Sequence, residues 1–348
     1  MATISWRQAV VLLVVLACIP VSFVAGRVLH ASMSTAPKSV SDPCANDLRS
    51  TCWTQYYEVF LEEHSAAEAL RDFKMKYEVL PGARTFCHPV LHVIGKSAGV
   101  EYASVAAAYA RGDTLCRSGY YHGVLEGRFA TEGGEKLIEQ LDSICDAVHD
   151  NGYTYNYYSC VHGIGHGLMA FFGHDIFESL RGCNRLSGAW EQASCAGGVF
   201  MENVTSDSEE MPSRFLKKDD PSYPCNSVEE KFVTQCYLMQ SSYMLKIFEG
   251  DFVKTFGVCR EAGVYAETCF QSIGRDVSAW SYGDIDTAIT LCGIGVSLEE
   301  RTNCLLGAAA DYILSYGEEA ARSLCAQGEE GARALCVERL EWHLSTQR

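Results

Sequence analysis

The chain lacks several motifs that assign a function directly. No two of its 17 cysteines are separated by only two residues, which argues against zinc fingers, thioredoxin-like redox sites and c-type haem attachment. No HExxH sequence is present, so a metalloprotease helix of that type is not expected. Basic residues are scarce, because 28 lysines and arginines stand against 44 aspartates and glutamates, for a net charge of −16. Such an acidic surface repels nucleic acid, which we exclude as a partner, and permits a basic protein or peptide partner.

Charge is also missing from one stretch near the N-terminus. Between two arginines, 18 uncharged and mostly apolar residues run from Ala9 to Gly26. A run of this length is just long enough to span a bilayer as a helix. We expect residues 1–27 to be a signal-anchor that attaches the protein to a membrane and leaves its main domain outside the cytoplasm, in a periplasmic, lumenal or extracellular space. A cleaved signal peptide, which gives a secreted protein, and lipidation at Cys18 are the alternatives.

The cysteines themselves are numerous and regularly spaced. Leaving out Cys18, 16 remain, and an even number this large predicts disulfides in an oxidising compartment. We predict that consecutive cysteines pair, as Cys44–Cys52, Cys87–Cys116, Cys145–Cys160, Cys183–Cys195, Cys225–Cys236, Cys259–Cys269, Cys292–Cys304 and Cys325–Cys336. From Cys160 onward the second members of the pairs recur every 32 to 41 residues, which is the size of one helix–turn–helix unit.

The segments between the cysteines favour helices. A glycine followed by an acidic residue precedes the first cysteine of several pairs, as in EGDFVKTFGVC, YGDIDTAITLC, YGEEAARSLC and GGEKLIEQLDSIC. Glycine commonly ends a helix, and an acidic residue favours the start of the next one through the helix dipole. Each unit is therefore expected to have a second helix that ends at a cysteine, and a following cysteine that opens the next helix. The predicted fold class is all-α, a right-handed array of about seven disulfide-stapled helical hairpins of the αα-repeat or solenoid type. In kind it is similar to the Sel1-like repeat proteins, although it lacks their glycine and lysine-alanine signature.

The predicted organisation follows from these patterns. The chain is expected to contain an N-terminal segment (1–27), a spacer (28–43) and a helical repeat domain (44–348), which has a histidine-bearing part (87–202) and histidine-poor repeats (225–348). The segment Glu202–Pro224 is polar and charged and contains prolines, so we expect a surface loop there. Asn203 begins an Asn-Val-Thr sequence, which is either a glycosylation site or a chance triplet.

Glycine recurs on the predicted helices of the histidine-bearing part. The segment CVHGIGHGLMA holds three glycines, although each one inside a helix costs about 0.8–1 kcal/mol relative to alanine. Gly163 and Gly167 are four residues apart and share a helix face, and so do Gly119 and Gly123. These pairs are expected to let neighbouring helices approach closely. Gly165 lies off this face, and we do not expect close packing to account for it.

Five of the ten histidines fall at the starts of three consecutive predicted helices. They are two pairs spaced by four residues with a single histidine between them, namely His88, His92, His122, His162 and His166. Residues four apart share a helix face, so each pair is able to bind one metal ion. Glu126 follows His122 by four residues and is a candidate ligand or orienting carboxylate, and Glu202 is a less favoured one. The units that follow carry other residue types at the corresponding position, namely Met201, Ser242, Arg275 and Ala310, which argues against a purely architectural role.

These residues predict that the imidazoles converge on one shared pocket that binds one or two ions. Imidazole-rich sites suit copper, iron or zinc, and paired cysteines are unavailable as ligands. The predicted function is that of an extracytoplasmic transition-metal-binding repeat protein, in which the metal is either carried or catalytic, as in a metal-dependent oxidoreductase. The alternative is a scaffold that binds a protein or peptide and whose histidines form a hydrogen-bonded structural core. A third hypothesis is a polar histidine core with pH-dependent stability. The other five histidines are assigned no role.

Overall fold

The computed structural model describes residues 41–45, 50–112, 115–132, 134–149, 154–207 and 212–346. Almost all of them belong to one compact unit, Pro43–Arg348. The predicted membrane segment, Cys18 within it and most of the predicted spacer lie outside the described residues. Within the described ranges, none of the helices combines the length and the apolarity needed to cross a bilayer.

The all-α class is confirmed, because all regular structure in the described residues is helical. The α-helices are α2 (Ser50–Glu63), α3 (Ala66–Val79), α4 (Pro81–Thr85), α5 (Cys87–Glu101), α6 (Val105–Tyr109), α7 (Leu115–Glu132), α8 (Gly134–Glu139), α9 (Leu141–Ile144), α10 (Tyr155–Phe171), α11 (Ile176–Cys183), α12 (Ala189–Thr205), α13 (Glu230–Ile247), α14 (Phe252–Arg260), α15 (Ala266–Ser281), α16 (Ile285–Cys292), α17 (Leu298–Tyr316), α18 (Glu318–Gln327) and α19 (Glu330–Thr346). Two short 3₁₀ helices, η1 (Asp146–Val148) and η2 (Gly263–Tyr265), join them.

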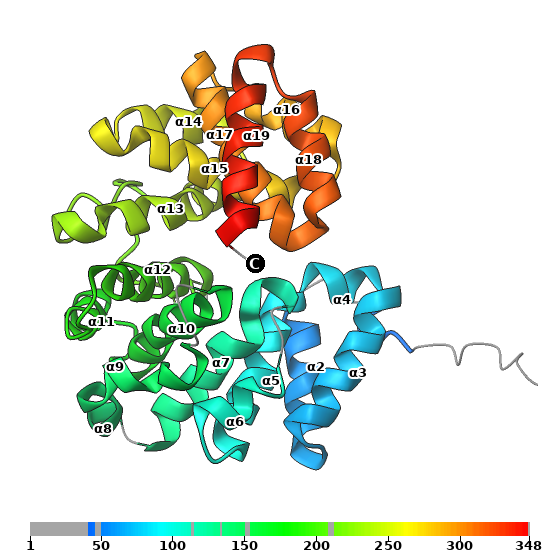
Figure 1. Cartoon of the computed structure of the whole chain (residues 1–348), viewed down its shortest axis with the longest axis vertical. Helices are drawn as coiled ribbons and strands as arrows, with labels where there is room; N and C mark the ends of the chain where they lie inside the picture. The colour runs from blue at the N-terminus through cyan, green and yellow to red at the C-terminus, as the bar shows by residue number, and fades with distance from the viewer. Residues whose placement is uncertain are drawn as a thin grey trace, which may run out of the picture. The chain divides into compact units, whose positions relative to one another are not determined.

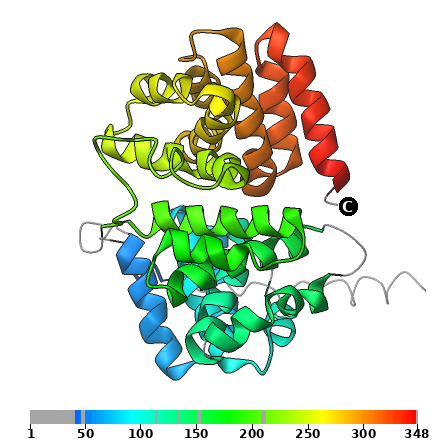
Figure 2. The ribbon, with the colours of Figure 1, turned by 90° about the vertical axis from the view of Figure 1, so that its left-hand side faces the viewer.

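The long helices pack on one another in chain order. Helix α5 packs on α7, α7 on α10, α10 on α12, and the series continues through α13, α15, α17 and α19 (Figure 1). Five shorter helices each pack against the long helix that follows, namely α6, α11, α14, α16 and α18 (Figure 2). Contacts also run between α7 and α17, where the Arg117 guanidinium donates to the Asp311 carboxylate at 2.5 Å. The histidine-bearing helices α5, α7 and α10 are therefore direct neighbours.

All eight predicted disulfides are present and join consecutive cysteines. In several of them the first cysteine ends a short helix and the second lies near the start of the next long one, as Cys183 does in α11 and Cys195 in α12. Cys225 departs from the expected unit, because it lies in a turn and not at the end of a helix. A bridge that closes a loop of 10–15 residues stabilises the fold by about 3 kcal/mol. Six of the eight bridges close loops of this size, and the eight together indicate an oxidising environment outside the cytoplasm.

The glycine-acid turns act as predicted at two helix starts. The Asp251 carboxylate accepts a hydrogen bond from the Lys254 backbone N–H at 3.0 Å, and Asp284 accepts one from Thr287 at 2.8 Å, so both cap the helices that they precede. The glycine before Asp251 has a φ of +82°, which the missing Cβ makes accessible. Local sequence therefore determines where α14 and α16 begin.

The predicted surface loop begins later than expected. Helix α12 continues to Thr205, so the segment from Glu202 to Thr205 is helical and the loop starts at Ser206. The side chain of Asn203 is buried, and its Oδ1 accepts a hydrogen bond from the Ser213 hydroxyl at 2.6 Å. Burial of this side chain favours the chance triplet over a glycosylation site. The helix continues because its inward face still has partners to pack against, which a reading of polar composition does not reveal.

Candidate metal centre

Helix α10 lies between α7 and α12, and its three glycines serve both contacts. Gly167 faces α7, where an added Cβ would lie 2.4 Å from the Phe129 ring. Gly165 faces α12 instead, and a Cβ there would lie 2.1 Å from the carbonyl oxygen of Cys195. The expectation that close packing does not account for Gly165 is therefore wrong. A helix that is packed tightly on two sides needs glycine on two faces, and the packing offsets the propensity cost.

Helices α5 and α7 also touch through their backbones. A Cβ on Gly95 of α5 would lie 2.0 Å from the Tyr120 carbonyl oxygen, and one on Gly123 of α7 would lie 2.1 Å from the His92 carbonyl oxygen. Such contacts are closer than any side chain allows. They bring the histidine of α7 directly beside the pair on α5.

The structure brings all five predicted histidines together into one group, here called the histidine cluster. It contains His88 and His92 from α5, His122 from α7, and His162 and His166 from α10. The centre of the His122 ring lies 5.5 and 5.4 Å from the ring centres of His88 and His92. It lies 4.9 and 4.8 Å from those of His162 and His166. His122 thus neighbours all four other rings, and the two pairs also meet each other, because the ring centres of His92 and His166 lie 5.2 Å apart.

Potential ligand atoms of the cluster form three overlapping groups. Within each group they all lie within 4.8 Å of one another, and the groups are His88–His92–His122, His122–His162–His166 and His92–Glu126–His166. Metal–nitrogen bonds are about 2.0–2.1 Å long, so a small inward movement of the rings allows each group to bind an ion. The imidazoles converge, but as overlapping groups of three and not around one common point.

Three of the rings have one nitrogen fixed by an acceptor. Their Nδ1 atoms donate hydrogen bonds as follows: His88 to the Cys116 carbonyl oxygen at 2.7 Å, His92 to Glu126 Oε1 at 2.7 Å, and His166 to Glu202 Oε2 at 2.8 Å. A carbonyl or an ionised carboxylate only accepts, so each Nδ1 carries the hydrogen. In a neutral ring the opposite nitrogen, Nε2, then has a free lone pair. Metal-binding histidines are held in this way in proteins.

Several imidazole nitrogens in the cluster are buried without a hydrogen-bond partner among the described residues. They are Nδ1 of His122 and Nε2 of His162 and His166. An unsatisfied buried polar atom costs about 1–3 kcal/mol, so three together are unfavourable in the absence of a ligand. Nε2 of His88 lies 3.1 Å from Nε2 of His92, where two lone pairs would repel. A proton or a metal ion between these nitrogens removes the repulsion, and 3.1 Å suits two ligands at roughly a right angle on one ion.

Burial keeps most of these rings neutral. It lowers the pKa of His88, His122 and His162 well below the usual value, and the neighbouring imidazoles lower each pKa further. The cause is that a charged ring is poorly solvated inside the protein and is repelled by other charged rings. Neutral imidazole is the form that binds metal ions, so these three rings are ready to act as ligands at neutral pH.

The two carboxylates have the opposite effect on their partners. Burial alone lowers the pKa of His92, but the negative charges of Glu126 and Glu202 more than offset it and raise this pKa. Burial likewise opposes ionisation of Glu202, yet the hydrogen bond that it accepts from His166 and electrostatic attraction from the neighbouring histidines lower the pKa of Glu202 to about 2. The centre therefore has anionic groups behind its ligands, which favours a bound cation.

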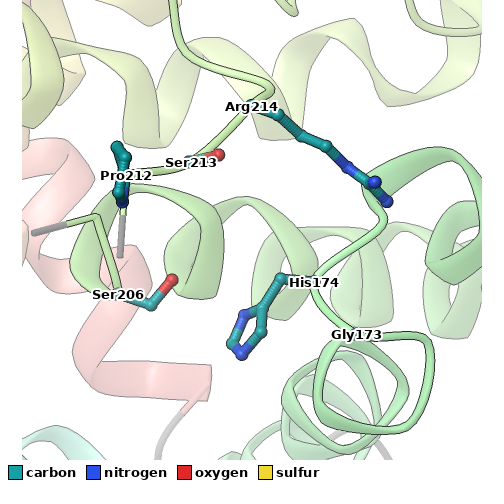
Figure 3. A pocket seen from close by; sticks show the side chains of 6 residues that line it. All are labelled: Gly173, His174, Ser206, Pro212, Ser213 and Arg214. Carbon is teal, nitrogen blue, oxygen red and sulfur yellow. The ribbon is translucent and has the colours of Figure 1, made fainter. Parts of the chain in front are cut away.

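Glu202 also links the cluster to the surface. Its Oε1 lies 3.8 Å from Nδ1 of His174, a half-exposed histidine to which the sequence assigned no role. His174 borders a pocket of about 230 Å³ that is also lined by Gly173, Ser206, Pro212, Ser213 and Arg214. Figure 3 shows the His174 ring directed across this pocket toward Ser206. One carboxylate thus connects buried His166 with a surface pocket.

The importance of Glu202 was underestimated in the sequence, although a signal was present. Glu202 follows Gly198 by four residues and so shares its helix face. Gly198 is the position at which α12 touches α10, since a Cβ there would lie 2.0 Å from the His162 carbonyl oxygen. A carboxylate one turn beyond such a contact faces the same neighbour.

The aromatic segment before Cys160 packs over one side of the cluster. The Tyr158 hydroxyl lies 3.2 Å from Nδ1 of His162, which is hydrogen-bond distance. Burial raises the pKa of Tyr158, so its hydroxyl keeps its proton and is available as a donor. If Tyr158 donates to Nδ1, the hydrogen of a neutral His162 ring lies on Nε2 and must leave or move to Nδ1 before an ion binds there.

One short segment resembles a catalytic motif without its structural setting. GKSAG, residues 95–99, has the letter pattern of a serine-hydrolase nucleophile elbow. That motif requires a sharp turn between a strand and a helix, whereas these residues lie in the middle of α5. Gly95 and Gly99 instead contact the backbone of α7.

Comparisons with known proteins add no relative, since no protein-family model, curated protein or solved structure matches the chain. The chemistry of the histidine cluster therefore rests on its own residues.

Proposed function

We propose that the protein is an extracytoplasmic protein that binds a transition metal, namely copper, iron or zinc, in the histidine cluster. The main observation behind this proposal is that one nitrogen of a ring has no hydrogen-bond partner while the other donates a hydrogen bond to a carboxylate. Nε2 of His166 is buried and unpartnered, while Nδ1 of the same ring is held by Glu202 at 2.8 Å. A purely structural histidine core is less well supported, because it leaves such nitrogens unsatisfied at a cost that a bound ion removes.

Different roles follow for the imidazoles and the carboxylates. The five imidazoles supply ligand nitrogens, a donor type that suits copper, iron and zinc. Glu126 and Glu202 orient His92 and His166, as carboxylates behind metal-binding histidines do. Glu126 is also a candidate ligand, because it lies in one of the three groups whose ligand atoms approach one another.

Burial favours a metal that is carried, or that reacts only with a small molecule. The side chains of His122, His162 and His166 are 3%, 1% and 1% exposed. A large substrate has no approach to an ion among them, whereas water or another small ligand needs little space. A metal-dependent oxidoreductase is therefore a form of this function only for a small substrate.

The setting of the centre is part of the proposal. The succession of long helices packed in chain order supports a right-handed αα solenoid. The apolar segment within residues 1–27 supports an N-terminal anchor in a membrane, with the disulfide-bonded domain outside the cytoplasm. Because the chain is acidic, its outer surface is suited to bind a basic protein or peptide, in addition to the metal bound inside.

Metal analysis of the purified protein tests this function. The full-length chain is purified oxidised, incubated separately with Cu²⁺, Zn²⁺ and Fe²⁺, freed of unbound metal and measured by elemental analysis. We expect stoichiometric metal in the unchanged protein and in the control His64→Ala, whose side chain is exposed and outside the cluster. We expect His166→Ala to bind less metal per chain than the unchanged protein does. A correctly folded unchanged protein that retains none of the three metals contradicts the proposal.

A further inference from the structure

The spacing of the donor atoms in the histidine cluster bears on the number of ions. Bonds of about 2.0–2.1 Å keep two nitrogens on one ion within about 4.2 Å of each other. The groups of potential ligand atoms that lie within 4.8 Å of one another contain only three residues each among the described residues. Five imidazoles therefore do not fit around one ion in this arrangement. Two of the groups together use all five rings and share only His122.

The two groups are built alike. Each combines the central ring of α7 with a pair of histidines spaced by four residues, from α5 in one case and from α10 in the other. In each pair the second histidine donates its Nδ1 hydrogen to a glutamate, His92 to Glu126 at 2.7 Å and His166 to Glu202 at 2.8 Å. The cluster thus has two half-sites of equal composition that share His122.

The surroundings of His122 leave its ring free for such a shared role. Its side chain is 3% exposed, and its Nδ1 is buried without a partner. No hydrogen bond among the described residues engages this ring, in contrast to the anchored rings of His88, His92 and His166. An imidazole has two nitrogens on opposite sides, and each can bind a different ion once the ring has lost its N–H hydrogen.

We propose that the histidine cluster is a two-ion centre in which His122 bridges the ions as an imidazolate. His88 and His92 bind one ion and one nitrogen of His122, and His162 and His166 bind the second ion and the other nitrogen. The first ion binds the neutral His122 ring through its free lone pair. The second ion displaces the remaining N–H proton, which leaves to solvent, so that one proton is released for the bridge. Three nitrogens on each ion leave a fourth position for water or a small ligand. The inference rests on the proposed function and adds the number of ions and their connection.

Copper provides a direct test, because an imidazolate couples the electron spins of two Cu²⁺ ions. The full-length oxidised chain is titrated with Cu²⁺, and bound copper and the integrated EPR signal are measured at each step. We expect two coppers per chain, with a total signal at two equivalents that is smaller than the signal at one equivalent. One copper per chain, or two coppers whose signals add, overturns the two-ion bridge while leaving metal binding intact. Absence of bound copper, zinc and iron instead overturns the proposed function itself.

Substitutions separate the bridge from the half-sites. His166→Ala removes a ligand of one half-site only, so we expect one copper per chain with a full, uncoupled signal. His122→Gln removes the bridge, so any two coppers retained must give additive signals. His64→Ala is the matched control and is expected to behave as the unchanged protein. Coupled signals in His122→Gln contradict the bridge, and the titration of the unchanged chain tests the proposal even if a variant does not fold.

Discussion

Replacing Gly198 with alanine tests whether the contact between α10 and α12 holds the metal centre together. The added Cβ would lie 2.0 Å from the His162 carbonyl oxygen, and the helices must separate by about 1.4 Å to reach the ordinary contact distance of 3.4 Å. No side-chain rotation relieves this contact, because the Cβ is bonded directly to the backbone of α12 and the oxygen belongs to the backbone of α10. The reciprocal contact of Gly165 with the Cys195 carbonyl oxygen holds the same two helices together.

The expected magnitude follows from two opposing effects. Overpacking a core costs about 1–3 kcal/mol, and a rigid backbone contact belongs at about 3 kcal/mol. Alanine is favoured over glycine in a helix by about 1 kcal/mol, which leaves a net loss of about 2 kcal/mol in the free energy of unfolding. Gly257 in α14 is the matched control, because its Cβ would meet nothing closer than the Arg260 side chain at 4.0 Å. Gly257→Ala is expected to gain up to about 1 kcal/mol, so the two variants should differ by about 3 kcal/mol.

The same substitution should weaken metal binding. Glu202 lies one turn beyond Gly198 on α12, so separation of the helices lengthens its 2.8 Å hydrogen bond to His166. Loss of such an orienting carboxylate lowers metal affinity about 10- to 100-fold. Urea denaturation of the oxidised, metal-free chain measures the stability, and competition with a chelator measures the affinity. A Gly198→Ala variant that is as stable as Gly257→Ala refutes the packing argument.

Two further predictions concern pH and metal uptake. Burial lowers the pKa of His88, His122 and His162 below the usual value of about 6.5. Once the pH falls below about 6.5, the unfolded chain therefore binds more protons than the folded chain. The raised pKa of His92 opposes this effect, but for one ring only. The metal-free chain should therefore become less stable to urea as the pH falls from 7.5 to 5. A stability that stays constant over this range contradicts the prediction. His174→Ala removes the imidazole at the pocket beside Glu202, and we expect slower Cu²⁺ uptake in stopped-flow mixing with an unchanged number of bound ions. Uptake as fast as in His64→Ala argues against this pocket as the route of entry.

The sequence predicted correctly those features that depend on residues close together in the chain. Disulfide pairing was predicted correctly for all eight bridges, because each cysteine of a short helical hairpin has its partner within 8 to 29 residues. Asp251 and Asp284 marked helix starts, since a capping side chain bonds to a backbone N–H only three residues further on.

The errors concern contacts between residues that are distant in sequence. Gly165 meets the carbonyl of Cys195, 30 residues later, so its role was invisible in the helix that contains it. The polar segment from Glu202 was read as a loop, although its first turn faces α10 and belongs to α12. Cys225 lies in a turn. A disulfide to Cys236 in α13 requires only that the two cysteines lie close together, and not that the first one ends a helix.

The amino-acid sequence by itself determined that this is a helical, disulfide-bonded chain whose first half carries histidines in pairs spaced by four. That spacing follows from the period of the α-helix, which needs no knowledge of neighbouring helices. Only the tertiary structure decided which nitrogen of each ring is fixed and which is free, because the acceptors that hold His88, His92 and His166 come from helices 28 to 36 residues away. The contact of His122 with both pairs was decided in the same way, by glycine contacts that bring the backbones of α5 and α7 together.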